Sequence, residues 1–143
     1  MKKITIINGP NLNLLGKREN DIYGNESFED YYSKLKNAFQ SEVEFSYFQS
    51  NVEGELVNFI QQAKGNADAI IINAAAYTHT SIAIGDALRA VQIPTIEVHL
   101  SHIFTREEYR HVSMLAGGTM GVISGFGLES YRLAVQFLLQ QPL

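Results

Sequence analysis

The run AIIINA at residues 69–74 belongs to the most apolar stretch of the chain. No polar residue interrupts it before Asn73, so an extended segment here is apolar on both faces, as in the central strand of a parallel sheet. The stretch is too short to cross a membrane, since Asp68 precedes it and the polar residues 77–79 follow. We therefore predict a buried strand at this point.

On both sides of this strand, short apolar and β-branched runs alternate with segments of helical periodicity. Further strands are predicted at residues 3–8, 43–48, 94–100 and 121–125. Helices are predicted at 27–40, from about 51, and at 80–91, 107–112 and 128–140. Serial βα units predict an α/β fold with helices on both faces of a parallel sheet. The favoured form is a flavodoxin-like three-layer sandwich, a five-stranded parallel sheet of order 2-1-3-4-5.

The sequence also predicts two details of the helices. Ser27 is the expected N-cap of the first helix, with Asp30 three positions later in a capping-box arrangement. The helix that starts near residue 51 is expected to place Val52 and Leu56 on its apolar face, because they are spaced by one helical turn.

Length and composition predict a single globular domain over residues 1–143. Hydrophobic residues make up 45% and charged residues 18% of the chain, which excludes a disordered tail or a coiled-coil rod. The net charge of −4 argues against binding to nucleic acid or to an anionic membrane, since both need clustered positive charge. The chain has no cysteine, which excludes disulfides and a thiolate nucleophile and fits a cytoplasmic location.

Polar clusters follow the carboxyl ends of the first, third and fourth predicted strands. They are NGPNLNLLGKRENDIYG at 8–24, NAAAYTHTS at 73–81, and EVHLSH at 97–102 followed by REEYR at 106–110. The first cluster lies in a connection longer than the usual βα loop of roughly 2–6 residues, which is typical of a lid or binding loop. The three strands are neighbours in the proposed order, and open α/β sheets bind ligands at this edge. We predict that the clusters converge on one cleft.

Glu97 and His99 are the first catalytic candidates. They are two positions apart on a strand, so their side chains point to the same face. A carboxylate beside an imidazole fixes its tautomer and favours its protonated form, which suits a general acid. The alternative is a core histidine with a satisfied hydrogen bond. The position at the carboxyl end of a strand favours the catalytic role.

Tyr23 is the candidate base. A phenol has a pKa of about 10, so it serves as a base only where nearby cations favour the phenolate. Arg18 lies in the same loop, and Arg106 and Arg110 rim the same predicted cleft. The alternative is a tyrosine that packs beneath the loop.

Neutral hydrogen-bonding side chains in these clusters suit a small polyhydroxylated or carboxylated ligand. They are Asn11, Asn73, His79 and Ser101. The alternative role of His79 is to help start the helix at 80–91, with Thr78 or Thr80 as its cap. The chain shows no recognisable metal-ligand spacing, and its only lysine near a strand end is Lys17 in the loop. We therefore expect neither a metal, nor an imine, nor any other cofactor.

At these clusters the chain resembles type II 3-dehydroquinate dehydratase, a small flavodoxin-like enzyme of the shikimate pathway. The resemblance runs from about Ile4 to Leu138 and rests on NGPNLNLLGKRE with the later YG, on NAAAYTHTSIAIGDAL, and on IEVHLS with REEYR. It implies trans elimination of water from 3-dehydroquinate to give 3-dehydroshikimate, through an enolate and without metal or imine.

The resemblance also implies a role for each matching residue. Tyr23 matches the base that removes the C2 proton, with Arg18 holding it as the phenolate. His99, oriented by Glu97, matches the acid that protonates the departing hydroxyl. Asn11 matches an asparagine that holds a water or a donor near the enolate oxygen. The remaining matches are substrate ligands: Asn73, His79 and Arg110 for ring hydroxyls, Leu100 and Ser101 for the carboxylate, and Asp86 for the site of a neighbouring subunit in a homododecamer built as a tetramer of trimers.

The chain also departs from the family pattern at three places near these motifs. Asn20 stands where the family usually has proline, and His102 stands where it usually has asparagine beside the carboxylate site. The run Arg110-His111-Val112 replaces the commoner Arg-Arg-His. Flavodoxin-like folds also serve as phosphorylation receivers and flavin-binding modules, and the fold alone does not choose among them. A receiver needs acidic residues after the first strand, where this chain has Asn8 and Asn11; a flavin module would absorb visible light.

Overall fold

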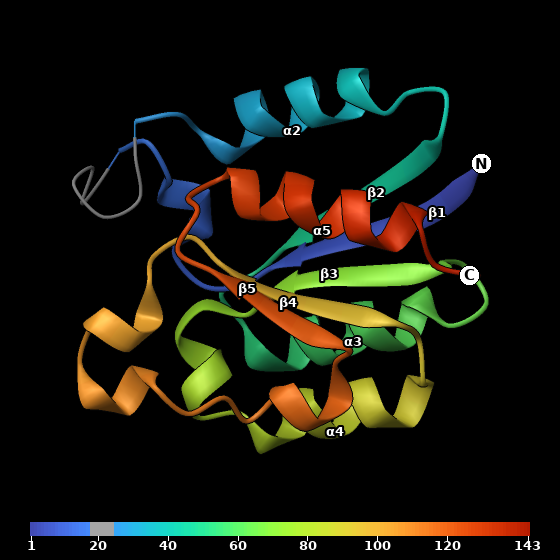
Figure 1. The fold of residues 1–143 in the computed structure, drawn as a ribbon. Coiled ribbons are helices and arrows are strands. Elements are labelled where there is room, and N and C mark those ends of the chain that lie inside the picture. The colour runs from blue at the N-terminus through green and yellow to red at the C-terminus, as the bar shows by residue number, and fades with distance from the viewer. Residues whose placement is uncertain (18–24) are drawn as a thin grey trace.

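The predicted strands form a parallel sheet in the order β2-β1-β3-β4-β5 (Figure 1). The computed structural model describes residues 1–17 and 25–143. The strands are β1 (Lys2–Asn8), β2 (Val43–Gln49), β3 (Ala69–Asn73), β4 (Thr95–His99) and β5 (Gly121–Ser124). The predicted α/β class and strand order are confirmed.

Helices cover both faces of this sheet (Figure 1). α2 (Phe28–Ala38) and α5 (Glu129–Leu139) lie on one face, and α3 (Glu53–Ala63) and α4 (Ile82–Val91) lie on the other. Short 3-10 turns lie in the connections: η1 (Leu12–Leu14), η2 (Ala75–His79), η3 (Ile103–Thr105), η4 (Glu108–Arg110) and η5 (Ala116–Gly118). Within residues 1–17 and 25–143, none of the helices is long and apolar enough to span a membrane.

The alternation of side chains along the central strands divides the core into two clusters. Ile6 and Ile71 belong to the cluster beneath α2 and α5. Ile7 and Ile72 belong to the cluster beneath α3 and α4. Every residue of β3 is buried, because this strand has strand neighbours on both edges and helices on both faces.

The helix starts follow the sequence prediction only in part. Ser27 caps α2 as predicted, and its hydroxyl accepts the Asp30 N–H at 3.2 Å. Val52 instead precedes α3 in an extended conformation and is 55% exposed. The prediction that Val52 lies on the apolar face is wrong, because the residue lies outside the helix and its side chain does not follow the helical period.

α4 begins later than predicted. Ser81 caps it, with a hydroxyl that accepts the Ile84 N–H at 2.9 Å, and the preceding residues form the separate turn η2. The alternative role for His79, in a helix start capped by Thr78 or Thr80, is therefore wrong. The helix predicted at 107–112 is likewise reduced to the 3-10 turn η4.

The ends of β1 and β3 meet so closely that the connection after β1 requires glycine. Gly9 N–H donates to Asn73 O at 2.8 Å. A Cβ atom at Gly9 would lie 2.5 Å from the Ala74 carbonyl oxygen, far inside van der Waals contact. This approach places the segment after β1 directly beside the segment after β3.

Candidate active site

A cleft opens at the carboxyl ends of β1, β3 and β4. Its walls come from the segment after β1, from η2, and from the chain between β4 and η4. The predicted site residues that line it are Asn11, Asn73, His79, His99, Leu100, Ser101 and Arg110. The three polar clusters thus meet in the described part of the chain, as the strand order requires.

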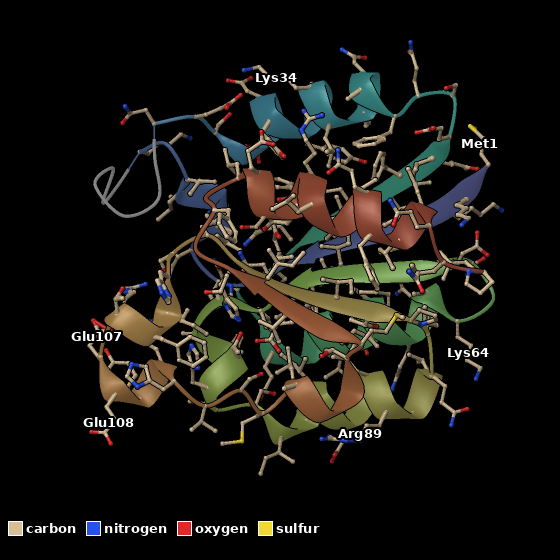
Figure 2. The ribbon with its side chains drawn as sticks, in the orientation of Figure 1. Met1, Lys34, Lys64, Arg89, Glu107 and Glu108 are labelled. Carbon is tan, nitrogen blue, oxygen red and sulfur yellow. The ribbon has the colours of Figure 1, made fainter. Side chains whose placement is uncertain are left out.

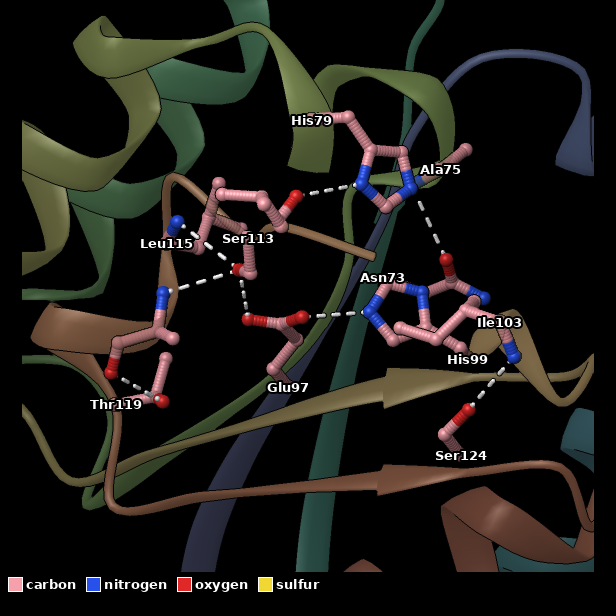
Figure 3. Close-up of polar contacts among 12 residues, drawn as sticks. Asn73, Ala75, His79, Glu97, His99, Ile103, Ser113, Leu115, Thr119 and Ser124 are labelled. Carbon is pink, nitrogen blue, oxygen red and sulfur yellow. Dashed lines mark hydrogen bonds and ion pairs between the residues drawn. The ribbon is translucent and has the colours of Figure 1, made fainter. Parts of the chain in front are cut away.

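His99 and Glu97 form a buried pair beside this cleft (Figure 3). His99 Nε2 lies 2.6 Å from Glu97 Oε2, and the two side chains are 6% and 0% exposed. An ionised carboxylate only accepts, so Nε2 carries the hydrogen and Nδ1 is the ring nitrogen left for a ligand.

Ser113 contacts the other oxygen of the same carboxylate (Figure 3). Its hydroxyl donates to Glu97 Oε1 at 2.7 Å. Sequence reasoning missed this residue, since it lies in a loop beyond η4 and belongs to none of the three polar clusters.

His79 is held as a neutral ligand group. Its Nδ1 donates to the Val112 carbonyl at 2.8 Å, and its ring lies 6.1 Å from that of His99 at an angle of 21°. Burial lowers the pKa of His79, and the nearby His99 and Arg110 act in the same direction. A neutral ring that donates through Nδ1 leaves Nε2 as an acceptor, suited to a ligand hydroxyl.

The Asn73 side chain lines the cleft and also forms hydrogen bonds within the protein. Its amide Nδ2 donates to the Tyr131 hydroxyl at 3.2 Å, and its Oδ1 accepts the Ala75 N–H at 3.1 Å. Tyr131 donates in turn to Asn8 Oδ1 at 2.6 Å. The amide retains a second hydrogen and a second lone pair for a ligand, in an orientation that this buried network fixes.

Asn11 is positioned through its backbone. It adopts the left-handed conformation with φ 71°, and its N–H donates to Asn51 Oδ1 at 3.0 Å. Gln49 Nε2 donates to the same oxygen at 3.2 Å and to the Gly9 carbonyl at 3.2 Å. Side chains from the end of β2 therefore fix the backbone that carries Asn11.

The segment after β4 is fixed from the side of β5. The Leu100 carbonyl accepts the Gly127 N–H at 2.9 Å, and the Ser101 carbonyl accepts the Ser124 hydroxyl at 3.0 Å. Arg106 Nη1 donates to Ser101 Oγ at 3.3 Å. Arg106 also lines the cleft, as does Arg110, so two guanidinium groups border this part of the site.

The remaining predicted residues are not part of this cleft as described. Asp86 lies on α4, and its side chain is 70% exposed. It pairs with Arg89 at 3.6 Å, and the Arg89 side chain points outward in Figure 2. Arg18 and Tyr23 lie outside the described residues. Among the described residues, no group of three or more histidines and carboxylates could hold a metal ion.

Comparison with known proteins gives concordant matches over nearly the whole chain. The family described as dehydroquinase class II matches residues 2–139. A 3-dehydroquinate dehydratase of a Nitratiruptor species is 57% identical over 134 residues, which cover 93% of this chain and 86% of that protein. One from Clostridium botulinum (strain Hall) is 52% identical over 140 residues, which cover 97% of this chain and 95% of that protein. The crystal structure of type II dehydroquinase from Butyrivibrio crossotus DSM 2876 gives a TM-score of 0.93 at 45% identity over 98% of both chains.

Proposed function

This chain belongs to the class II dehydroquinase family, and from that premise we propose that it removes water from 3-dehydroquinate to give 3-dehydroshikimate in the shikimate pathway. The observation that carries the proposal is the buried Glu97–His99 pair beside a cleft of neutral donors and guanidinium groups. The receiver and flavin-binding alternatives have no support in the family match.

We propose a stepwise trans elimination. Tyr23, as the phenolate stabilised by Arg18, takes the proton from C2, and the electron pair of that bond forms an enolate with the adjacent ketone. The enolate then expels the hydroxyl of the neighbouring carbon, and His99 gives its proton to that oxygen so that water leaves. Asn11 holds a water or a donor near the enolate oxygen. No cofactor enters these steps.

The geometry of His99 supports its part as the acid. Because His99 Nε2 lies 2.6 Å from Glu97 Oε2 and donates its hydrogen there, the proton for the leaving hydroxyl would come from Nδ1. Glu97 keeps the ring in the tautomer that can be reprotonated at Nδ1.

Substrate binding follows from the same cleft. We propose that Asn73, His79 and Arg110 bind ring hydroxyls, and that Leu100 and Ser101 bind the carboxylate through their amides and the serine hydroxyl. The Leu100 carbonyl points toward Gly127 N, so the Ser101 N–H, which belongs to the same trans peptide, points the opposite way. Arg106 adds positive charge beside the Ser101 hydroxyl.

The function is tested by adding 3-dehydroquinate to the purified protein and following the ultraviolet absorbance of the conjugated enone. We expect turnover that is unchanged by a chelator such as EDTA and by borohydride added with the substrate. Loss of activity under borohydride with a covalent adduct on a lysine would contradict the mechanism. Absence of enone formation under all conditions would contradict the function.

We further propose that residues 1–143 act as one catalytic domain in the cytoplasm and that the active form is a homododecamer, a tetramer of trimers. In this assembly Asp86 would reach the cleft of a neighbouring subunit. Its exposed position on α4, paired only loosely with Arg89 at 3.6 Å, supports a contact made outside its own chain.

Asp86→Ala is expected to lower kcat/KM about tenfold, the scale of one hydrogen bond to a charged group. Glu129→Ala is the matched control, because Glu129 makes the same i,i+3 pair with Arg132 on α5 at 3.0 Å, and it should leave kcat/KM unchanged. Light scattering of the parent should give a multiple of three chains. A fully active monomer would exclude a role for Asp86 across a subunit boundary.

A further inference from the structure

The carboxylate of Glu97 is fully buried, and within the described part of the chain each of its oxygens accepts a hydrogen bond. Oε2 accepts from His99 Nε2 at 2.6 Å, and Oε1 accepts from the Ser113 hydroxyl at 2.7 Å. Figure 3 shows Glu97 between these two side chains. A buried carboxylate needs hydrogen bonds or charges in place of the lost water, and the Ser113 hydroxyl is one of the groups that supply them.

The direction of the Ser113 hydroxyl is fixed by its other contacts. Its oxygen accepts two backbone N–H groups, those of Leu115 and Ala116, each at 3.1 Å. A serine hydroxyl has two lone pairs and one hydrogen. Because both lone pairs are occupied, the hydrogen points to Glu97 and the serine acts there as a donor only.

The loop that carries Ser113 is itself anchored on both sides of the residue. Met114 N–H donates to the Thr78 carbonyl at 2.7 Å, and Leu115 is fully buried in the core. Gly85 allows α4 to approach this loop, since a Cβ atom there would lie 2.4 Å from the Met114 carbonyl oxygen. The hydroxyl is therefore held in place before any ligand binds.

A second cavity, which we call the rear cavity, borders the Glu97 carboxylate and Ser113. It has a volume of about 610 Å³, and its lining includes Glu97, Ser113, His102 and His111. A carboxylate released by Ser113 could rotate toward these histidines or toward water. Turning away in this manner would remove the acceptor that orients His99.

We propose that Ser113 is a positioning residue for the reaction: it holds the Glu97 carboxylate oriented so that Oε2 accepts the Nε2 hydrogen of His99 and Nδ1 faces the substrate. This role rests on the proposed function, because it acts through the acid that the elimination requires. Ser113 is not among the described residues that line the cleft, so the proposed role is distinct from substrate binding.

Ser113→Ala is expected to lower kcat about tenfold, the effect of removing one hydrogen bond to a charged group, with little change in KM. It should also change the kcat–pH profile, because the carboxylate that contacts His99 loses the hydrogen bond that Ser113 donates to its other oxygen. The other titratable or charged groups near the pair are unchanged in this variant: His79, Arg106 and Arg110 on the cleft side, and His102 and His111 at the rear cavity.

Two further variants separate positioning from a general loss of stability. Ser113→Thr keeps the hydroxyl, and its extra methyl group has room in the rear cavity, so it should restore kcat and the parental profile. Ser81→Ala removes another buried hydroxyl that accepts a backbone N–H, and should lower thermal stability without moving the profile. If Ser113→Ala does not fold, Ser113→Cys, a weak donor of similar size, should show the same changes to a smaller degree.

The proposal would be overturned by an unchanged kcat in Ser113→Ala. It would also be overturned if kcat fell but the pH profile did not move and Ser113→Thr did not restore kcat. A measurement made without substrate tests the role of Ser113 independently of the proposed function. The proton on His99 Nε2, assigned by its loss in His99→Ala, should give a low-field NMR resonance that shifts in Ser113→Ala and returns in Ser113→Thr. A parent enzyme inactive on 3-dehydroquinate would contradict the function, whereas an unshifted resonance would contradict the role of Ser113.

Discussion

Replacing His99 by alanine is expected to lower kcat at least about a hundredfold, since general acid catalysis typically contributes about 10²–10⁴-fold. The variant loses the group that protonates the departing hydroxyl, while the lining of the cleft otherwise remains. The measurement is kcat and KM from the enone absorbance. A kcat near that of the parent would reassign His99 to the core histidine that the sequence left as the alternative.

Two companion variants make this result interpretable. His99→Ala leaves the buried Glu97 without its imidazole partner, which can itself destabilise the fold. His99→Asn keeps a donor for Glu97 but has no transferable proton, so it should fold well and lose the same activity. Glu97→Gln should lose much less than His99→Ala, because the proposed acid itself remains in this variant and only the carboxylate that orients it is changed.

The sequence predicts the fold where the chain repeats a simple physical pattern. The run 69–74 is apolar on both faces, and the structure buries every residue of β3. The ends of the helices are harder to predict from the sequence, because a cap depends on the backbone conformation of one residue. Ser81 and Thr80 both have the side chain of a good cap, and only the turn η2, which ends at His79, determines that Ser81 takes that position.

The candidate site was predictable to the extent that it follows strand ends. Asn11 and His79 follow strands, and His99 is the last residue of one, and the strand order brings these three residues together. Partners from distant segments could not be predicted, because no local pattern pairs them. Ser113 reaches Glu97 across sixteen positions, and Tyr131 reaches Asn73 across 58 positions.

Tyr23→Phe is expected to abolish detectable elimination while leaving substrate binding nearly intact. Removal of a proton beside a ketone needs a strong base, and a phenolate at neutral pH requires the pKa of a phenol to fall by roughly 2–3 from about 10. Burial does the opposite elsewhere in this chain, raising the pKa of Tyr31 and of Tyr47 to about 12. No tyrosine among the described residues lines the cleft, and Tyr23 itself lies outside those residues.

We expect Arg18 to determine whether that proposed base is ionised. At about 1.36 kcal/mol per pKa unit, the phenolate needs roughly 3–4 kcal/mol of differential stabilisation, which a guanidinium held close in a water-poor cleft can supply. Arg18→Gln should therefore leave the base present but protonated, with a low rate that climbs as the pH rises toward the ordinary range of a phenol. Arg18→Lys keeps the positive charge but lacks the planar guanidinium group, so it should retain only part of the parental rate. The pH–rate profiles of these variants decide the assignment. A positioned base typically contributes at least about a hundredfold to the rate. If Tyr23→Phe keeps more than about a hundredth of the parental rate, Tyr23 is not the base.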